Sequence, residues 1–521
     1  MGRCCILFCA IVLALTATES DAARILGLFH YNGRSHFVMF EALLKGLAAK
    51  GHDVTVVSHF PQKKKLPNYT DLSLEGSLPR LVNNFTVDTV RSFGHLKLMD
   101  FMWNTNLDYC KIVLDHPVMQ NMMKTKEKFD VIITEIYAID CSYGFSYKFN
   151  IPIIGMISSV STPWANAAVG NPDNPSYIPN YFLSYRPQMS FTDRLTNMLF
   201  HAFTSGTEYI LGNLRTDKLL REYFGPDMPA LLELTRRTSL VFVNSHFSIN
   251  QPRPAVPAFV EVGGLHIPQP KKLPKDIENF LNGAEHGAIY FSFGSLVKGE
   301  TLPKDKLHAF VEAFRKVPQR VIWKIDGAAI SDLPQNIKTS TWLPQLDILS
   351  HPNVRLFISH GGLMGSQEAV YTGVPLLGIP LFADQYQNIK SLAHTGMALK
   401  LDYDEINEET FSKALDTVLN DHSYQEKAKH LSQLFRDRPH SAMETAIFWT
   451  EYIIRHGGAP HLRSAAVDMP LYQYLLLDVL LVLLLGVGIV IATLWFSIRM
   501  LLTFILFGKV SKVRMESKKR E

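Results

Sequence analysis

This chain of 521 residues has few cysteines, a small net charge and no internal repeat. The five cysteines show no metal-binding spacing, which argues against a structural zinc site. Basic residues exceed acidic residues by only four and form no basic stripe, which excludes a nucleic-acid-binding protein. No low-complexity tract or fixed-period repeat is present, which excludes a solenoid. The remaining composition, 47% hydrophobic and 19% charged, is that of a globular protein.

The length predicts two domains of roughly 200 residues each, because single cores rarely grow larger than about 300 residues. Residues 23–250 begin with a buried strand, a helix at 37–49 and a strand at 53–58. Further strands are expected at 130–134, 151–157 and 240–243. This strand–helix–strand order predicts a parallel, doubly wound sheet.

A proline-rich passage begins at residue 251, and we interpret residues 251–285 as a linker. The strand–helix pattern then restarts in residues 286–440. Strands are expected at 288–293, 320–324, 354–359 and 375–379, and a helix at 305–315. Two such halves predict an α/β protein with two Rossmann-like domains facing a cleft, which is where a ligand would bind. A helical segment, 441–470, follows.

Both ends of the chain carry apolar runs of different length. The run near the N-terminus has about twelve residues, so residues 1–22 are expected to be a cleaved signal peptide, with a first transmembrane helix as the alternative. Residues 479–498 carry no charge, and we predict a transmembrane helix within 471–500. The apolar residues 500–508 are too few to span again, and a tilted or interfacial extension is expected.

The basic tail, 501–521, is expected in the cytosol, which puts the preceding domains on the lumenal side. Lys518 and Lys519 resemble an endoplasmic reticulum retrieval signal, although a plain basic flank is the alternative. We therefore predict a single-pass type I protein of the endoplasmic reticulum membrane. Sequons at Asn68 and Asn84 lie on the predicted lumenal side and are candidate glycosylation sites.

Three cysteines would leave with the signal peptide. Cys110 and Cys141 would remain, and they form either one lumenal disulfide or two buried thiols.

The richest segment for chemistry is 342–388. Gly361 and Gly362 lie between the predicted strand 354–359 and a helix. The free N–H groups at a helix N-terminus suit a diphosphate, and glycine lets it approach closely. Glu368 lies one turn into that helix, where ribose hydroxyls would be in reach.

Asp384 and Gln385 follow another strand end and could hold sugar hydroxyls, although Asp384 could also be a helix N-cap.

These residues resemble the signature segment of the UDP-glycosyltransferases of GT-B fold, in their animal membrane-bound branch. The resemblance extends to VGGLH at 262–266, to FSFGS at 291–295 and to the apolar segments at both ends. It implies donor-binding roles for eight residues. These are Trp342 and Gln345 at the uracil, Ser295, His360 and Gly362 at the diphosphate, Glu368 at the ribose, and Asp384 and Gln385 at the transferred sugar.

The sequence departs from the family pattern at Met364 and Gly365, where many relatives carry Asn or Ser. A side-chain contact to phosphate from these positions is therefore not expected. The departure also supports an alternative function, a non-catalytic UDP-sugar-binding or partner protein.

His36 follows the first strand, at the start of the first helix, just after Ser35 as a candidate N-cap. A helix N-terminus disfavours imidazolium, so a neutral ring able to act as a general base is expected. His36 also matches the family's catalytic histidine. A carboxylate must hold the ring, and either Glu135 or Asp140 could do so. We favour Asp140 because the family uses aspartate, whereas Glu135 fits by strand register.

Asp402 and Asp404 spell the DxD pattern of metal-dependent glycosyltransferases, but they lie in an acidic run downstream of the donor segment and are interpreted as a solvated loop. No metal and no cofactor is expected if a helix terminus carries the leaving-group charge.

The resemblance implies an inverting enzyme that transfers a hexosyl group, with UDP-glucose favoured as donor and small lipophilic alcohols or phenols as acceptors. A UDP-glucuronosyltransferase is the alternative. The aromatic region 160–235 is a candidate acceptor pocket or lid. The sequence leaves open whether the protein forms a homo-oligomer.

Overall fold

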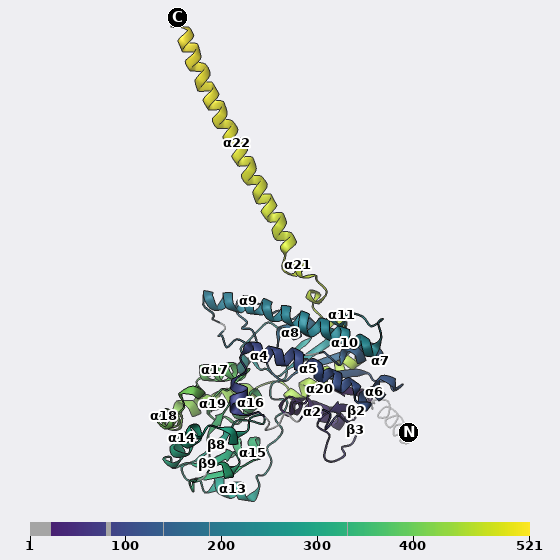
Figure 1. Ribbon diagram of the computed structural model, residues 1–521, viewed down its shortest axis with the longest axis vertical. Helices are drawn as coiled ribbons and strands as arrows, with labels where there is room; N and C mark the ends of the chain where they lie inside the picture. The colour runs from purple at the N-terminus through teal and green to yellow at the C-terminus, as the bar shows by residue number, and fades with distance from the viewer. Residues whose placement is uncertain (1–21, 80–84, 139, 187, 331, 521) are drawn as a thin grey trace, which may run out of the picture. The chain divides into compact units, whose positions relative to one another are not determined.

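A computed structural model describes residues 22–79, 85–138, 140–186, 188–330 and 332–520. Its contacts divide the chain into one compact unit up to Ser464 and a second unit from Ala465 onwards. The first unit contains two parallel sheets, and the second contains a long helix (Figure 1). Apart from Ala22, the predicted signal peptide lies outside the described residues.

The N-terminal lobe is built on a seven-stranded sheet of order β3-β2-β1-β4-β5-β6-β7, and each neighbouring pair is parallel. Its central strands are buried apolar runs, typical of a parallel sheet covered by helices on both faces. The strands are β1 Arg24–Leu28, β2 Asp53–Ser58, β3 Tyr69–Ser73, β4 Val131–Glu135, β5 Ile153–Ile157, β6 Thr238–Val243 and β7 Phe259–Glu261.

The C-terminal lobe is built on a six-stranded parallel sheet of order β10-β9-β8-β11-β12-β13. The order reverses between β8 and β11, and this switch point is where ligands bind in open α/β sheets. The strands are β8 Ala288–Ser292, β9 Arg320–Lys324, β10 Ile337–Ser340, β11 Val354–Ser359, β12 Leu376–Gly378 and β13 Ala398–Lys400.

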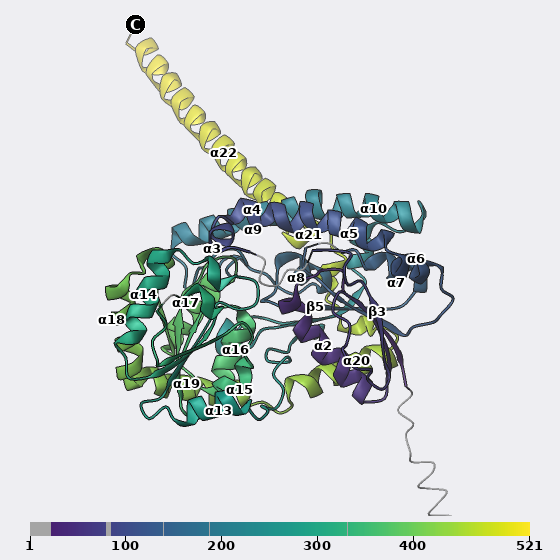
Figure 2. The ribbon, with the colours of Figure 1, turned by 60° about the horizontal axis from the view of Figure 1, so that its bottom comes forward.

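Helices connect the strands of both sheets (Figures 1 and 2). In the N-terminal lobe they are α2 Arg34–Ala49, α4 His95–Asp100, α5 Asn106–Asp115, α6 Pro117–Lys124, α7 Tyr143–Phe149, α8 Pro163–Val169, α9 Phe191–Thr207, α10 Leu214–Phe224 and α11 Leu231–Thr235. In the C-terminal lobe they are α13 Lys275–Asn282, α14 Lys304–Arg315, α15 Gln345–Leu349, α16 Leu363–Thr372, α17 Gln385–Thr395, α18 Glu408–Asn420 and α19 His422–Arg436. Two short helices from the N-terminal half of the chain, α3 Val87–Arg91 and α12 Phe247–Asn250, pack on the core of the C-terminal lobe instead.

The helix α20 (Ala442–Arg455) returns to the N-terminal lobe and packs against α2 (Figure 2). Ala446, Ile447 and Ile453 belong to the same buried cluster as the residues of β1 and β2. Gly46 of α2 permits this contact, because an added Cβ would lie 2.5 Å from the sulfur of Met443. The chain thus crosses between lobes twice, and the predicted helical segment 441–470 contributes to the N-terminal core.

Short and polar strands differ most from the sequence-based expectation. The apolar strands β9 and β11 have the predicted bounds. The edge strands β3 (YTDLS) and β10 (IKTS) were not predicted, because their polar residues give no clear alternation. β7 lies inside the proline-rich passage interpreted as a linker, and it completes the N-terminal sheet.

The second unit contains α21 (Leu471–Tyr474) and α22 (Leu477–Lys518). Within the described residues, one helix, Leu477–Met515, is long and apolar enough to cross a membrane. The predicted span 479–498 lies inside it. The expected extension at 500–508 is a continuation of the same helix.

Cys110 of α5 and Cys141 after β4 are joined by a disulfide bond, which decides between the two alternatives that the sequence left open. Of the two sequons, Asn68 is exposed and has a positive φ of 57°. Asn84 lies outside the described residues.

We expect Cys141→Ser to lower the apparent melting temperature by roughly 6–15 °C, because the disulfide closes a loop of 31 residues and such loops contribute about 3–4 kcal/mol. Differential scanning fluorimetry measures the shift. Reductant should lower the wild-type value similarly and leave the variant unchanged. A wild-type melting temperature that does not respond to reductant would contradict this expectation.

Candidate active site

A cavity of about 800 Å³ opens between the two lobes, at the carboxyl ends of both sheets. All eight candidate donor residues and His36 line it. The cavity therefore gathers both halves of the predicted site, which lie more than 250 residues apart in the chain. Glu135 contacts His36 behind this lining, whereas Asp140 is not part of the lining.

His36 lies in the first turn of α2, which begins at Arg34 with Gly33 as N-cap. The helix begins earlier than predicted, and Ser35 is therefore not the cap. His36 Nδ1 is 2.5 Å from Oε1 of the buried Glu135. Ser158 donates a hydrogen bond to the same oxygen at 3.4 Å. With Nδ1 directed at a carboxylate, Nε2 carries the lone pair that a general base requires.

The preference for Asp140 as the partner of His36 was wrong. Strands β1 and β4 are neighbours, with Leu28 opposite Thr134, so Glu135 ends its strand beside the loop that leads to His36. Asp140 comes later, in the turn that precedes α7, where burial raises the pKa of its carboxyl to about 7. The strand register therefore decides the partner rather than the type of acid.

Two tyrosines flank His36, and sequence reasoning missed both. The rings of Tyr31 and Tyr137 each lie 4.8 Å from the imidazole, centroid to centroid. Burial raises the pKa of both phenols far above the ordinary value, so they stay neutral. Their positions, one before the first helix and one just after β4, are the sequence signal that could have identified them.

Two segments of the N-terminal half contribute apolar side chains to the cavity. Residues 160–235, the predicted acceptor pocket, contribute Tyr181 to the lining. The segment before α5, which we did not single out, contributes five, namely Phe85, Val90, Phe93, Leu98 and Phe101. Phe85, Val90 and Phe93 also pack against the core of the C-terminal lobe.

His360 follows β11, and its ring fits between two glycines. A Cβ added at Gly294 would lie 2.5 Å from the ring, and one added at Gly362 would lie 2.8 Å from Nε2. Burial, together with nearby Lys324, lowers the pKa of His360 to about 4, so the ring is neutral at pH 7. Its buried Nδ1 lacks a hydrogen-bond partner among the described atoms.

Gly362 is the N-cap of α16, as expected for an anion site at a helix N-terminus. The first N–H groups of such a helix have no partner within it and point outward with partial positive charge. Ser295 also lines this end of the cavity, next to Gly294. Lys324 donates to the carbonyl oxygen of Gly294 at 2.6 Å. Neutral imidazole, backbone amides and a lysine thus surround one space suited to a dianion.

A hydrogen-bonded chain joins the predicted uracil and ribose positions. Gln345 donates to Glu368 at 2.7 Å and accepts from the Tyr290 hydroxyl at 3.3 Å. Burial raises the pKa of Glu368 to about 7, although Gln345 partly offsets this. The Trp342 side chain is 70% exposed at the mouth of the cavity, where its ring is free to stack on a base.

Asp384 faces the N-terminal lobe from the start of α17. Asp384 is the N-cap residue of α17, as the alternative expected, but its side chain makes no capping hydrogen bond and its carboxylate instead accepts a hydrogen bond from Asn388 at 2.9 Å. Burial raises the pKa of Asp384, although Asn388 and the nearby His36 partly offset this. Gln385 Oε1 accepts from the backbone of Leu381 and Phe382 at 2.9 and 3.1 Å, which holds the turn that carries Asp384.

The two departures from the family pattern have packing reasons. Met364 packs against the core of the N-terminal lobe, and its carbonyl lies 3.2 Å from His266 Nε2. At Gly365 an added Cβ would come within 3.1 Å of Gln345 Nε2. Both residues nevertheless line the cavity, and their backbone amides stay in place at the N-terminus of α16.

Gln367 is a second feature that sequence reasoning missed. It is fully buried, donates to the carbonyl of Asn244 at 3.0 Å and accepts from the Gly264 amide at 3.0 Å. Gly263 has no room for a Cβ, which would lie 2.6 Å from the Ser245 carbonyl oxygen. The VGGLH segment thus fixes α16 against the N-terminal lobe.

The DxD pattern lies outside the cavity. Asp404 forms an ion pair with Arg91, and Asp402 lies 2.7 Å from Lys400. Among the residues that the structure describes, no group of three His, Cys, Asp or Glu residues is arranged to hold a metal ion.

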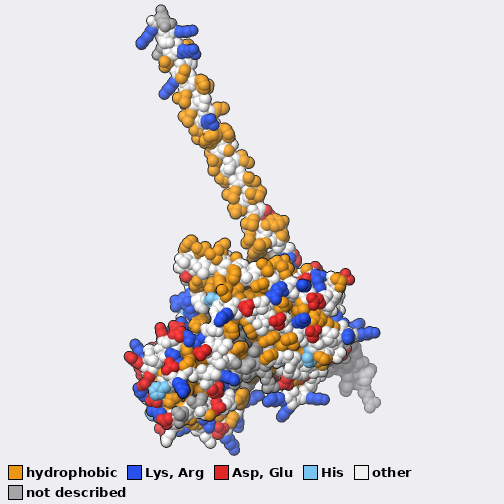
Figure 3. Space-filling view, viewed as in Figure 1, with side chains coloured by type: hydrophobic (Ala, Val, Ile, Leu, Met, Phe, Trp, Pro, Cys, Tyr) orange, Lys and Arg blue, Asp and Glu red, His pale blue; other side chains and the backbone are white. Residues whose placement is uncertain are grey.

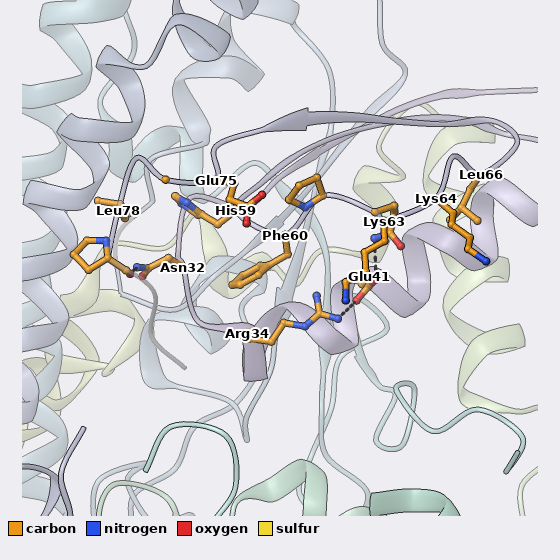
Figure 4. Close-up of a pocket in the computed structure, with 14 residues that line it drawn as sticks. Asn32, Arg34, Glu41, His59, Phe60, Lys63, Lys64, Leu66, Glu75 and Leu78 are labelled. Atoms are coloured by element: carbon orange, nitrogen blue, oxygen red, sulfur yellow. Dashed lines mark hydrogen bonds and ion pairs between the residues drawn. The ribbon is translucent and has the colours of Figure 1, made fainter. Parts of the chain in front are cut away.

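A second cavity of about 820 Å³ lies beside α2 in the N-terminal lobe (Figure 4). Arg34 and Lys45 each donate to Glu41 at 2.7 Å, and Gln62 donates at 2.8 Å. Burial alone would raise the pKa of Glu41, but these partners lower it overall. Arg34 borders both cavities, and its guanidinium points toward Glu41 (Figure 4).

Comparison with solved structures supports the fold. The UDP-glucose: anthocyanidin 3-O-glucosyltransferase in complex with UDP superposes with a TM-score of 0.56 at 17% identity, covering 84% of this chain and 100% of that one. A glycosyltransferase of kitacinnamycin gives the same TM-score at 19% identity, covering 82% and 98%. The predicted GT-B fold is confirmed.

Sequence comparison identifies the family. Residues 28–513 match the family described as UDP-glucoronosyl and UDP-glucosyl transferase. UDP-glycosyltransferase UGT5 of Dactylopius coccus is 40% identical and covers 98% of this chain and 99% of its own length. UDP-glucosyltransferase 2 of the same organism is 42% identical, with 92% and 93% covered. Human UDP-glucuronosyltransferase 2B7 is 32% identical, with 88% and 89% covered. The chain therefore belongs to the UDP-glucosyl and UDP-glucuronosyl transferases and is a glycosyltransferase enzyme.

Proposed function

We propose that this enzyme transfers glucose from UDP-glucose, with inversion, to a hydroxyl group of small lipophilic acceptors. One observation carries the proposal: the His36–Glu135 pair, Asp384 and the N-terminus of α16 all meet at one cavity. The His36–Glu135 pair would supply a base, Asp384 a contact to the sugar, and the N-terminus of α16 an anion site.

In the proposed reaction, the acceptor O–H proton passes to His36 Nε2 while the acceptor oxygen attacks the anomeric carbon. The bond from that carbon to the diphosphate oxygen breaks, and UDP leaves with the electron pair. Attack from the face opposite UDP inverts the anomeric centre. Glu135 stabilises the imidazolium that forms. The amides at 362–365 and the neutral His360 stabilise the charge that develops on the diphosphate without a metal ion or cofactor.

Glucose is favoured over glucuronate by the charges around the sugar position. The Asp384 carboxylate faces that position, and a second carboxylate there would be repelled. Of the three Lys or Arg side chains that line the cavity within the described residues, Arg34 pairs with Glu41 and Lys324 donates to the Gly294 carbonyl, while Lys271 is exposed. UDP-glucosyltransferase 2 of Dactylopius coccus, by its name, uses the same donor class.

The acceptor class follows from the aromatic wall formed by Tyr31, Tyr137, Tyr181, Phe93 and Phe101. Flat, apolar alcohols and phenols would bury their rings there while presenting a hydroxyl to His36. We further propose that α22 anchors the enzyme in the endoplasmic reticulum membrane, with the catalytic unit in the lumen, the signal peptide removed and Asn68 and Asn84 glycosylated.

A donor-by-acceptor screen of the full-length enzyme in proteoliposomes tests the proposal. Mass spectrometry should detect a glucoside of a simple phenol, and the anomeric proton coupling in its NMR spectrum should identify it as the β-anomer. The kcat/KM for UDP-glucose should be about tenfold or more above that for UDP-glucuronate. Turnover should be unchanged by EDTA. Preferred transfer of glucuronate would refute the assignment of the donor. UDP binding without transfer to any acceptor would refute the catalytic assignment.

We expect Gly294→Ala to weaken UDP binding by about tenfold or more, because an added Cβ would displace His360 from the diphosphate end of the cavity. Isothermal titration calorimetry measures the dissociation constant. Gly294 also has a positive φ of 80°, so Gly51→Ala is a matched control: its φ is 101°, but nothing lies within 4 Å of the added Cβ. Equal loss of UDP affinity in both variants would attribute the effect to backbone strain and contradict the role of His360.

A further inference from the structure

Helix α9 and the π-helical segment Glu208–Asn213 that follows it expose an unusually apolar face. Six large side chains there are between 44% and 71% exposed. They are Phe191, Leu195, Met198, Leu199, Phe203 and Ile210, which we call the α9 patch. Figure 3 shows hydrophobic side chains gathered over this helix. Contiguous exposed apolar patches are rare on soluble proteins and mark contact surfaces.

The spacing of the α9 patch is that of one helix face. Positions 191, 195, 198 and 199 follow the i, i+4, i+7, i+8 pattern, and 203 continues it. The opposite face is committed to the fold, since Asn197 is buried and donates to the carbonyls of Pro175 and Ile178 at 2.8 and 2.9 Å. The apolar side chains of the α9 patch are therefore not needed to hold α9 on the lobe.

The exposed charges within residues 191–218 are basic, and the exposed acid Glu222 follows on the next turn of α10. Arg194, Arg215 and Lys218 are exposed. The three acids of residues 191–218 are all only partly exposed. Asp193 closes the N-terminal capping box, and Asp217 pairs with Arg221 at 2.8 Å. Burial raises the pKa of Glu208 to about 8, so this acid is mostly neutral at pH 7.

We propose that the α9 patch docks the catalytic unit onto an anionic lipid bilayer. An apolar helix face bordered by cations is the composition of helices that lie in the membrane interface. A second copy of the chain fits less well, because a two-fold contact through α9 would bring the exposed Arg194, Arg215 and Lys218 of both copies together.

Because the candidate span anchors the chain in the bilayer, weak binding of the α9 patch to lipid is enough to dock the catalytic unit. The candidate span begins at Leu477, and residues 465–476 connect it to the catalytic unit. Twelve residues reach at most about 40 Å, so the bilayer is always within range of the unit. The second contact is then intramolecular and needs little affinity of its own.

Lipid photolabelling of the full-length enzyme tests the proposal. The probe is a phospholipid with a diazirine on its acyl chain, in vesicles of phosphatidylcholine with phosphatidylserine or of phosphatidylcholine alone. Peptide mapping should find labels in residues 191–214 as well as in the span 477–515, which serves as an internal reference. Met198→Glu combined with Leu199→Glu should reduce labelling of 191–214 by roughly tenfold relative to the span.

Two further variants keep the test specific. Leu434→Glu on α19 is a matched control, because Leu434 is 44% exposed but remote in sequence from the α9 patch, and it should leave labelling unchanged. Lys218→Gln should reduce labelling about fivefold in phosphatidylserine vesicles and leave it unchanged in phosphatidylcholine. An unchanged melting temperature verifies folding of each variant.

The proposal is overturned if residues 191–214 of the wild type carry no label, or if the double variant is labelled as strongly as the wild type. A concentration-dependent dimer that the double variant loses, without lipid labelling, would also overturn it and assign the α9 patch to a second copy.

Discussion

Replacement of His36 by alanine should lower kcat by about 10²–10⁴-fold, the contribution of a positioned general base. The His36 imidazole lines the cavity with Nδ1 held 2.5 Å from Glu135, which leaves Nε2 as the ring nitrogen available to take up a proton. Without the imidazole, the acceptor hydroxyl has no positioned base and must lose its proton to water. Initial rates at saturating UDP-glucose and phenol measure the loss.

The affinity for UDP distinguishes a catalytic loss from a structural one. His36 belongs to the N-terminal lobe, whereas the diphosphate position lies at α16 of the C-terminal lobe. The dissociation constant of UDP should therefore stay within about twofold of wild type in the His36→Ala variant. His308→Ala, an exposed histidine on α14, is the matched control and should retain full turnover. Normal turnover by a folded His36→Ala enzyme would remove His36 from the mechanism.

Glu135→Gln should lower kcat by about 10²-fold or more, although glutamine has nearly the same shape. The substitution removes the negative charge that stabilises the imidazolium, and the amide can present its N–H to Nδ1 and impose the wrong tautomer. The KM for UDP-glucose should change little, because Glu135 touches His36 and Ser158 rather than the donor positions. Steady-state kinetics with varied donor and acceptor separate the two parameters.

Asp140→Asn is the decisive companion to Glu135→Gln. Asp140 is a nearby acid with a pKa raised by burial to about 7, and it makes no recorded contact with His36 within the described residues. Its neutral replacement should keep kcat within about threefold of wild type. If the asparagine variant loses activity and the glutamine variant keeps it, the sequence-based preference was right and the assignment from the structure is wrong.

The sequence predicted those parts of the fold that rest on long apolar runs. Strands β9 and β11 begin and end where the apolar pattern does, because both are buried on two faces. The edge strand β3 was missed because its side chains are polar and contact solvent as much as the core. β7 was missed because prolines surround it, and only pairing with β6 makes it a strand.

The candidate site divides along a similar line. Gly362 before α16 and Glu368 one turn into it follow from a contiguous segment, whereas the role of Gln345 was implied only by the family resemblance. The partner of His36 depends on the register of β1 with β4, which local sequence does not encode. The tyrosines beside His36 and the buried Gln367 likewise act through contacts between distant segments. Such contacts arise only when the tertiary fold brings the segments together.

The decisive measurement is the structure of the enzyme crystallised with UDP in the presence of a divalent cation. The diphosphate should lie within about 3 Å of the backbone amides at 362–365 and beside His360, with no metal bridging it to the protein. UDP bound through a divalent ion, or bound away from the N-terminus of α16, would contradict a metal-free diphosphate site at this helix terminus.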